Sequence, residues 1–142
     1  MSSEFRGNSP KGGFRDTIGM RVVELDDGLA VMELAIGPET LNSHGSLHGG
    51  AIAAIIDNTG GLAGCYCHET RQIRKAVTLS LTTSFIGPAL SGTIRAIGRK
   101  RSRTRRIFVS TVEVTDKNGN LIAVGEATYR YVGEERHQHG TP

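Results

Sequence analysis

The segment around position 48 combines groups that could stabilise an oxyanion. A polar loop ends in His48-Gly49-Gly50, and the two glycines open an apolar segment that carries the carboxylate Asp57. The first N–H groups of a helix have no partner within the helix and lie at the positive end of its dipole. Gly49 and Gly50 would leave these donors open to a ligand carbonyl, and one such donor is worth about 3 to 4 kcal/mol to an oxyanion. The segment therefore predicts an oxyanion-binding helix start.

Asp57 follows Ile55 and Ile56, and an unpaired carboxylate buried among such residues would be costly. One interpretation makes Asp57 a general base or nucleophile in a cleft. The other makes it a structural carboxylate that is satisfied by the backbone of a neighbouring chain or by Asn58. The residue alone leaves both interpretations open.

His44 and His48 stand four residues apart and Asp57 could add a third ligand, a combination that would suggest a metal site. The glycines after His48 argue against one helix through both histidines, and no second His/Cys cluster supports a site, so we expect no metal. Cys65 and Cys67 lie too close together for a disulfide framework. We expect both to pack as small apolar side chains near the helix end.

Positive charge is concentrated in one stretch, although the formal net charge is only +3. Alternating arginines would share one face of a continued strand, whereas a turn at 102–104 would cluster them at a tip. Both arrangements predict a local anionic partner, and a solvated edge that blunts strand pairing is the alternative. The seven basic residues of this stretch are Arg95, Arg99, Lys100, Arg101, Arg103, Arg105 and Arg106.

The elements that must position these groups form the order ββαββββ. The pattern predicts strands at 20–25, 29–36, 76–86, 92–101, 105–116 and 121–132 and one buried helix from 49 to about 66. Asp26-Asp27-Gly28 predicts a hairpin turn, and Asn118-Gly119 predicts a type I′ turn. We expect an α+β fold in which an antiparallel sheet wraps the helix. Gly60, Gly61 and Gly64 would then allow close packing of the helix.

The 142 residues fit one domain, which we place at 16–132 between flexible tails at 1–15 and 133–142. The N-terminal stretch has no apolar run of the kind a signal peptide needs, and charged and polar residues interrupt every longer apolar segment. We therefore expect a soluble, cytoplasmic protein without a membrane partner.

Several spaced motifs together resemble the hotdog-fold acyl-CoA thioesterases, in the phenylacetate-type or PaaI-like branch. They are Asn42-x2-Gly45-x2-His48-Gly49-Gly50, Asp57 nine residues after His48, the strand end Ser84-Phe85-Ile86-Gly87-Pro88-Ala89, and Gly119-Asn120-Leu121-Ile122-Ala123-x-Gly125. The resemblance covers about residues 16–132.

This resemblance implies a homodimer that joins edge strands and places active sites at its interface, and we expect a homotetramer as a dimer of dimers. Gly49 would donate its N–H to the thioester carbonyl, while Asp57 attacks the thioester or activates water across the interface. Asn42 would position the water or the carbonyl, His48 would orient the loop, and Thr78 would lie near the reacting centre. A thioester has a good leaving group, so no cofactor is expected beyond the coenzyme A of the substrate.

The phosphates of coenzyme A suit arginine side chains. We expect Arg103, Arg105 and Arg106 to bind them, with Arg99 and Arg101 behind, and Gly50 to contact the substrate.

Three functions other than thioester hydrolysis are compatible with parts of this sequence. The alternative from another class is a non-catalytic acyl-CoA-binding sensor, which would keep Gly49 and the arginines but would not need Asp57. A hotdog dehydratase would need a different arrangement of His and acid. Nucleic-acid binding is disfavoured because aromatic residues make up only 5% of the chain. Aryl or medium-chain acyl groups are the expected substrates.

Overall fold

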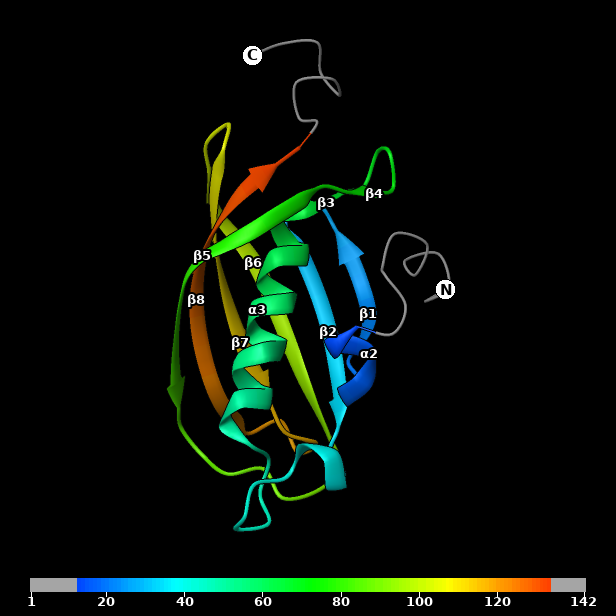
Figure 1. The fold of residues 1–142 in the computed structure, drawn as a ribbon, viewed down its shortest axis with the longest axis vertical. Coiled ribbons are helices and arrows are strands. Elements are labelled where there is room, and N and C mark those ends of the chain that lie inside the picture. The colour runs from blue at the N-terminus through cyan, green and yellow to red at the C-terminus, as the bar shows by residue number, and fades with distance from the viewer. Residues whose placement is uncertain (1–12, 134–142) are drawn as a thin grey trace.

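One long helix and one antiparallel sheet make up most of the computed structural model, which describes residues 13–133. Helix α3 (Gly49–Cys65) lies against one face of a six-stranded sheet with the strand order β1-β2-β6-β7-β8-β5. The sheet curves around the helix (Figure 1). The predicted α+β fold, a central helix wrapped by an antiparallel sheet, is therefore confirmed. The strands are β1 (Arg21–Asp26), β2 (Leu29–Ala35), β5 (Lys75–Phe85), β6 (Thr93–Arg103), β7 (Ile107–Thr115) and β8 (Leu121–Val132).

Helix α3 is buried along most of its length because its residues are apolar or very small. Ile55 and Ile56 are fully buried against the sheet. A Cβ added to Gly64 would overlap the ring of Phe108, and the Ser110 hydroxyl reaches the Gly60 carbonyl at 2.8 Å. The expectation that helix glycines allow close packing against the sheet is thus confirmed.

Helix α2 (Phe14–Ile18) was not predicted, because five residues are too few to show helical periodicity. It ends at Gly19, whose φ of +87° lets its N–H reach the carbonyls of Arg15 and Asp16. Its first two residues therefore belong to a helix rather than to the expected tail at 1–15. The remaining tail predictions, 1–12 and 134–142, lie outside the described residues.

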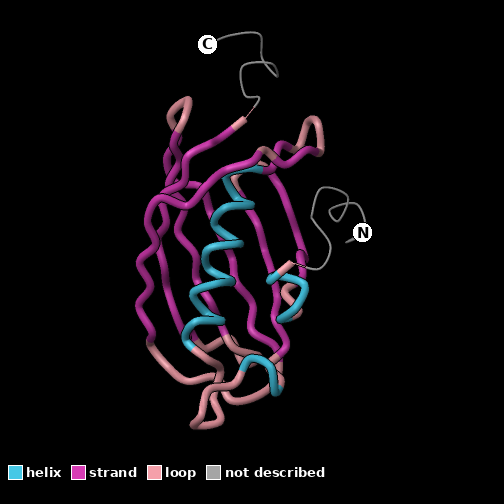
Figure 2. Tube along the Cα trace, viewed as in Figure 1, coloured by secondary structure: helices cyan, strands magenta, loops and turns pink. Residues whose placement is uncertain are grey.

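Three other short elements also escaped prediction. A 3-10 turn, η1 (Pro38–Thr40), precedes the loop before α3. After α3 the chain forms a small hairpin from β3 (Tyr66–Cys67) and β4 (Gln72–Ile73) (Figure 2). Two-residue strands give too little alternation to be recognised in a sequence.

The turn between β7 and β8 is not the predicted type I′ turn. That turn needs a positive φ at both central residues, whereas Gly119 has a φ of +84° and Asn118 does not have a positive φ. The Asp116 carboxylate accepts the N–H groups of Asn118 and Asn120 at 2.9 Å and so stabilises a longer loop. The hairpin itself is present, with Thr115 opposite Leu121.

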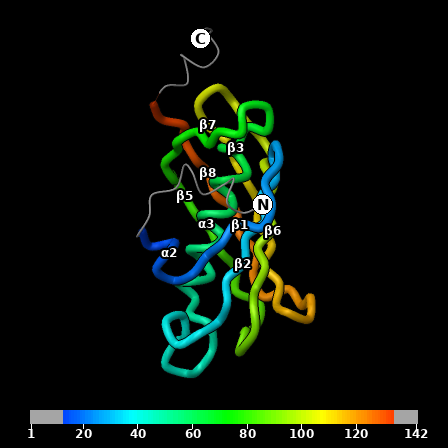
Figure 3. The backbone as a smooth tube through the Cα atoms, turned by 90° about the vertical axis from the view of Figure 1, so that its right-hand side faces the viewer, coloured from blue at the N-terminus to red at the C-terminus, as the bar shows by residue number. Residues whose placement is uncertain are grey.

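The two ends of the sheet order are edges. Figure 3 views the molecule from the β1 edge, and β5 forms the opposite edge, bonded only to β8 among the described strands. Two register shifts matter for the site, one in β5 between Thr78 and Ser80 and one in β6 between Lys100 and Ser102. Each shift changes which residues of its strand face the helix.

Candidate active site

Asp57 lies in the middle of α3, partly buried, and its carboxylate is held by β5. Its Oδ1 accepts a 2.7 Å hydrogen bond from the Thr78 hydroxyl. Both residues line a cleft of about 640 Å³ that α3, α2 and the start of β5 enclose. The neighbouring Asn58 instead donates to the Ala54 carbonyl at 3.4 Å. The Asp57 carboxylate therefore lies in a cleft, as the first of the two interpretations expects, while its role as a base or nucleophile stays a prediction.

The position of Thr78 follows from the pairing of β5 with β8. Thr78 stands opposite Tyr129, a buried residue on the helix side of the sheet. The register of β5 then shifts, so that Ser80 is the next paired residue. The structure therefore brings together Asp57 and Thr78, two of the residues that the resemblance placed at the reacting centre.

Tyr129 is a site residue that the sequence analysis missed. Its hydroxyl donates to the backbone carbonyl of Asp57 at 2.7 Å, and its ring stacks on Phe108 with 4.7 Å between centroids. Burial, and then the charge of Asp57, raise the pKa of Tyr129 above its ordinary value. A signal was present in the tyrosine on a core-facing strand and in Gly60-Gly61 on the helix, but only the folded chain shows that they meet.

Asn42 holds the loop before α3 in shape. Its Oδ1 accepts the N–H groups of His44 at 2.8 Å and Ser46 at 3.1 Å, and its Nδ2 donates to the Ser46 hydroxyl at 3.0 Å. Its backbone N–H also donates to the Ser46 carbonyl at 2.7 Å. Asn42 thus makes most of the hydrogen bonds within the loop. These contacts use one of the two N–H groups on its side-chain amide.

His48 caps α3 and accepts the N–H of only one of the two glycines that follow it. Its Nδ1 accepts the N–H of Gly50 at 2.7 Å, so that this nitrogen is unprotonated and the donor of Gly50 is already used. The Gly49 N–H has no acceptor among the residues that the structure describes. Gly49 is therefore the open donor of the helix start. The Phe85 ring lies beside it, 3.4 Å from where a Gly49 Cβ would stand.

Gly49 and Asp57 of one chain are too far apart to act on the same carbonyl. At a rise of about 1.5 Å per residue, the separation of eight positions between them spans about 12 Å along the helix axis. Figure 1 shows the helix start at the lower end of the molecule and the helix running up towards β3. Gly49 and Asp57 of one chain therefore lie at separate places along α3.

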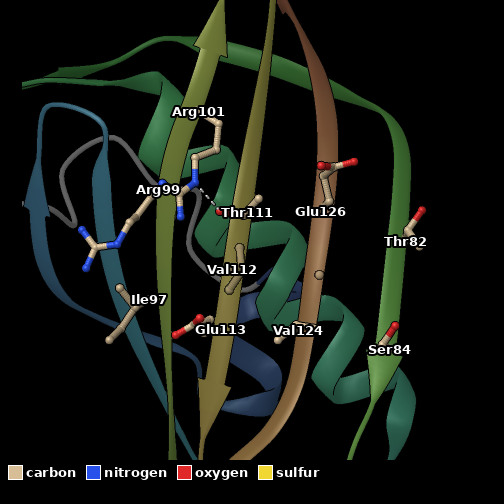
Figure 4. A pocket seen from close by; sticks show the side chains of 11 residues that line it. Thr82, Ser84, Ile97, Arg99, Arg101, Thr111, Val112, Glu113, Val124 and Glu126 are labelled. Carbon is tan, nitrogen blue, oxygen red and sulfur yellow. Dashed lines mark hydrogen bonds between the residues drawn. The ribbon is translucent and has the colours of Figure 1, made fainter.

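The arginines do not share one face, because the register shift in β6 divides them. Arg99 and Arg101 lie on the sheet face opposite α3, where they line a hollow of about 520 Å³ with Glu113 and Glu126 (Figure 4). Arg101 donates from Nε to the Thr111 hydroxyl at 2.7 Å.

Arg103 follows the register shift, and its guanidinium carbon lies 5.2 Å from the centroid of the Tyr131 ring. Arg105 and Arg106 belong to the turn after it, which Thr104 organises by accepting the N–H groups of Arg106 at 3.3 Å and Ile107 at 3.0 Å. This tip lies at the same end of the molecule as the end of α3 (Figure 1). Arg74 and Lys75, which the sequence analysis did not select, line the Asp57 cleft itself.

The described part of the chain contains neither a cluster of metal-ligating side chains nor a disulfide. Within residues 13–133 no group of three or more His, Cys, Asp or Glu side chains could hold a metal ion. Cys65 and Cys67 are both free. Burial raises the pKa of the Cys65 thiol to about 12, while hydrogen bonds with Thr70 lower the pKa of Cys67. No helix in this range is long and apolar enough to cross a membrane.

Comparison with known proteins identifies the family of this arrangement. Residues 44–123 match the model of the thioesterase superfamily. A putative esterase of Saccharolobus solfataricus is 31% identical over 102 residues, which cover 72% of this chain and 71% of that protein. The acyl-coenzyme A thioesterase PaaI of Escherichia coli is 25% identical over 117 residues, covering 82% of this chain and 80% of PaaI. The solved structure of a conserved protein of Pseudomonas aeruginosa has a TM-score of 0.77 at 30% identity, with 84% of this chain and 94% of that chain covered.

Proposed function

The chain belongs to the thioesterase superfamily as a PaaI-like hotdog protein, and we propose that it is an acyl-coenzyme A thioesterase that releases a carboxylic acid and free coenzyme A. The observation that carries this proposal is the Asp57 carboxylate, hydrogen-bonded to Thr78 in a cleft. A binding module would need no such group. The open N–H of Gly49 adds the second element that thioester hydrolysis requires, a donor for the developing oxyanion.

The chemistry needs only these groups because a thiolate leaves readily. The carbonyl oxygen of the thioester accepts the Gly49 N–H, which stabilises negative charge as the carbon becomes tetrahedral. Asp57 takes a proton from a water that attacks this carbon, or its own oxygen attacks to form an anhydride that water then opens. In both courses the C–S bond breaks and coenzyme A leaves as its thiolate. In the first course Asp57 returns to it the proton taken from water, and in the second the thiolate takes a proton from solvent. Thr78 holds the carboxylate towards the cleft by its hydrogen bond.

We propose further that the two halves of the site come from different subunits of a homodimer. Strand β5 is an edge strand with exposed apolar side chains at Val77, Leu79 and Leu81, which indicates that it is covered by another chain. Antiparallel pairing of two β5 strands brings the start of one beside the end of the other. Thr78 stands near the start, and Phe85 at the end contacts the position of Gly49. The pairing therefore carries Asp57 of one subunit towards Gly49 of its partner.

We also propose that two such dimers form a homotetramer and that the protein works in the cytoplasm. Molar mass measured by light scattering distinguishes a dimer from a tetramer. The substitution Leu79→Asp on the β5 edge is expected to give monomers without activity.

The cleft supports an aryl or medium-chain acyl group. Leu62, Val77 and Phe14 give it apolar lining, and a volume of about 640 Å³ is within the range of small-molecule pockets. Arg103, Arg105 and Arg106 then bind the phosphates of coenzyme A at the tip. Arg99 and Arg101 lie on the opposite face of the sheet (Figure 4), so a role for them in phosphate binding stays a prediction.

Two measurements test the function and the shared site together. The first is thiol release from acetyl-, hexanoyl-, palmitoyl-, phenylacetyl- and hydroxybenzoyl-coenzyme A by the wild type and by Asp57→Asn, which should lose about 100-fold or more in kcat. The matched control is Glu126→Gln, which neutralises a carboxylate on the outer face. If the wild type hydrolyses none of these esters but binds them, the sensor function takes the place of the enzyme.

The second measurement mixes two inactive variants, Asp57→Asn and Gly49→Pro, by unfolding and refolding them together. A mixed dimer then contains one intact site, so about a quarter of the wild-type activity should return. No recovery in a preparation that contains mixed dimers would show that each site is built from one chain.

A further inference from the structure

We infer that Tyr129 is a positioning residue that holds the Asp57 carboxylate in its reactive place through the backbone of α3. This inference rests on the proposed function, in which Asp57 is the reacting carboxylate. Its basis is one juxtaposition: Tyr129 is bonded to the main chain of Asp57 and is also the strand partner of Thr78.

Tyr129 fixes Asp57 from two directions. Its hydroxyl donates to the Asp57 carbonyl at 2.7 Å, which sets the height and rotation of α3 at this residue. Its backbone pairs with Thr78, and the Thr78 hydroxyl donates to the Asp57 carboxylate at 2.7 Å. Tyr129 of β8 therefore holds the main chain of Asp57 directly, and it holds the side chain of Asp57 through its strand partner Thr78. A shift of Tyr129 would move the carboxylate relative to the hydroxyl that holds it.

The fold makes specific room for this contact. A Cβ on Gly60 would stand 2.5 Å from the Tyr129 hydroxyl oxygen, too close for any real contact, whereas one on Gly61 would stand 3.4 Å from the ring, an ordinary contact distance. On its other side the ring stacks on Phe108 with an interplanar angle of 14°. Tyr129 is only 2% exposed. The ring therefore has one position, in which its hydroxyl points at the helix backbone.

The hydroxyl remains a donor at any pH at which the protein is assayed. Its burial disfavours the phenolate, and the nearby Asp57 charge disfavours it further, so the pKa lies above the usual value for tyrosine. Tyr129 does not exchange a proton with the reacting groups in this scheme. It acts by geometry, and its removal should therefore lower kcat without weakening the binding of substrate.

Tyr131 provides a matched control on the same strand. Its hydroxyl donates to the Gly64 carbonyl of α3 at 2.6 Å, and the residue is 6% exposed. Gly64 lies seven residues beyond Asp57, about 10 Å along the helix. Tyr129 and Tyr131 thus make the same type of hydrogen bond to the same helix, but only one of these bonds is at the carboxylate.

The experiment compares Tyr129→Phe with Tyr131→Phe, since each removes one hydroxyl and keeps the ring. Both variants should lower Tm by similar amounts. Tyr129→Phe should reduce kcat about tenfold with KM within about twofold of the wild type, whereas Tyr131→Phe should leave both constants within about twofold. Equal effects of the two variants on kcat, or an unchanged kcat in Tyr129→Phe, would overturn the inference.

Two further variants separate this inference from the proposed function. In Asp57→Asn the added substitution Tyr129→Phe should cause no further loss of kcat, because Tyr129 acts through Asp57; an additional tenfold loss contradicts that route. If Asp57→Asn keeps full activity, the proposed carboxylate itself is wrong. If Tyr129→Phe does not fold, Gly60→Ala displaces the hydroxyl while keeping the tyrosine, with Gly61→Ala as its control. Gly60→Ala should then lower kcat about tenfold more than Gly61→Ala, and equal values reject the inference.

Discussion

The hydroxyl of Thr78 donates a 2.7 Å hydrogen bond to Oδ1 of Asp57 across 21 residues of chain. The bond joins the middle of α3 to the start of the edge strand β5. Because it occupies one carboxylate oxygen, it fixes the direction in which the other oxygen can act. The strength of this bond in the reaction can be measured directly.

Thr78→Val is expected to lower kcat about tenfold, since a hydrogen bond to a charged group is worth about 1.5 to 3 kcal/mol. Thr78→Ser keeps the hydroxyl and should restore most of the activity. Thr78 is exposed, so thermal unfolding should change little in both variants. Steady-state kinetics on the best acyl-coenzyme A substrate provide the check, and equal activities of the Val and Ser variants would contradict a role for the hydroxyl.

Gly49→Pro removes the open N–H at the first position of α3, and kcat should fall about 100-fold because the oxyanion loses its donor. Proline is well tolerated at the first position of a helix, and His48 before it has the extended backbone, φ −64° and ψ 135°, that proline requires. The folded structure should therefore persist in circular dichroism. Gly49→Ala adds a similar side chain beside Phe85 but keeps the N–H, and it should stay within about fivefold of the wild type. Comparable losses in the two variants would assign the effect to crowding.

Neutralising Arg105 and Arg106 together, as Arg105→Gln/Arg106→Gln, is expected to raise KM for acyl-coenzyme A about fivefold at low salt, because each exposed ion pair contributes up to about 1 kcal/mol. The effect should shrink as salt rises. The corresponding acyl-pantetheine lacks the nucleotide and should show no change in KM. Arg99→Gln on the opposite face serves as the control, and an equal effect there would place the phosphates elsewhere.

Alkaline conditions should destabilise the fold through Cys65. Its folded pKa is raised to about 12 by burial, so the unfolded chain loses this proton first as the pH rises. The stability that the neutral thiol supports is complete below the ordinary pKa of a thiol, about 9, and falls by about 1.4 kcal/mol per pH unit towards 12. Tyr129, whose pKa is also raised, adds to this loss above about pH 10.

Thermal unfolding of the wild type and Cys65→Ala between pH 8 and 10 measures this contribution. The wild type should lose more stability than the variant over this range. Parallel curves for the two proteins would show that the Cys65 thiol is not the group responsible.

The order of strands and helix could be predicted from the sequence because the signals are local. Alternation marks the strands, and a long run of Ala, Ile, Leu and Gly marks α3. The motif around His48 likewise placed Gly49 at a helix start, and the structure confirms that position. Short elements such as α2 and the β3–β4 hairpin lack a full period and could not be predicted in this way.

Three features were decided only by the tertiary structure: the faces on which the arginines lie, the glycine that keeps an open N–H, and the contact between Tyr129 and Asp57. The register shift after Lys100 divides the arginines between two faces, and an alternating sequence does not show where a strand shifts its register. The hydrogen bond from the Gly50 N–H to His48 Nδ1 leaves Gly49 as the open donor, a choice that the two neighbouring glycines alone left open and that only the resemblance had made.

The contact of Tyr129 with Asp57 joins residues 72 positions apart. The sequence by itself determined which groups are available: a carboxylate on a helix, glycines at the start of that helix and hydroxyls on the strands. It could do so because residue type and local periodicity are properties of the sequence alone. Which of them meet depended on how the sheet curves around α3 and on the pairing of β5 with β8. Long-range packing sets that geometry, and no local pattern encodes it.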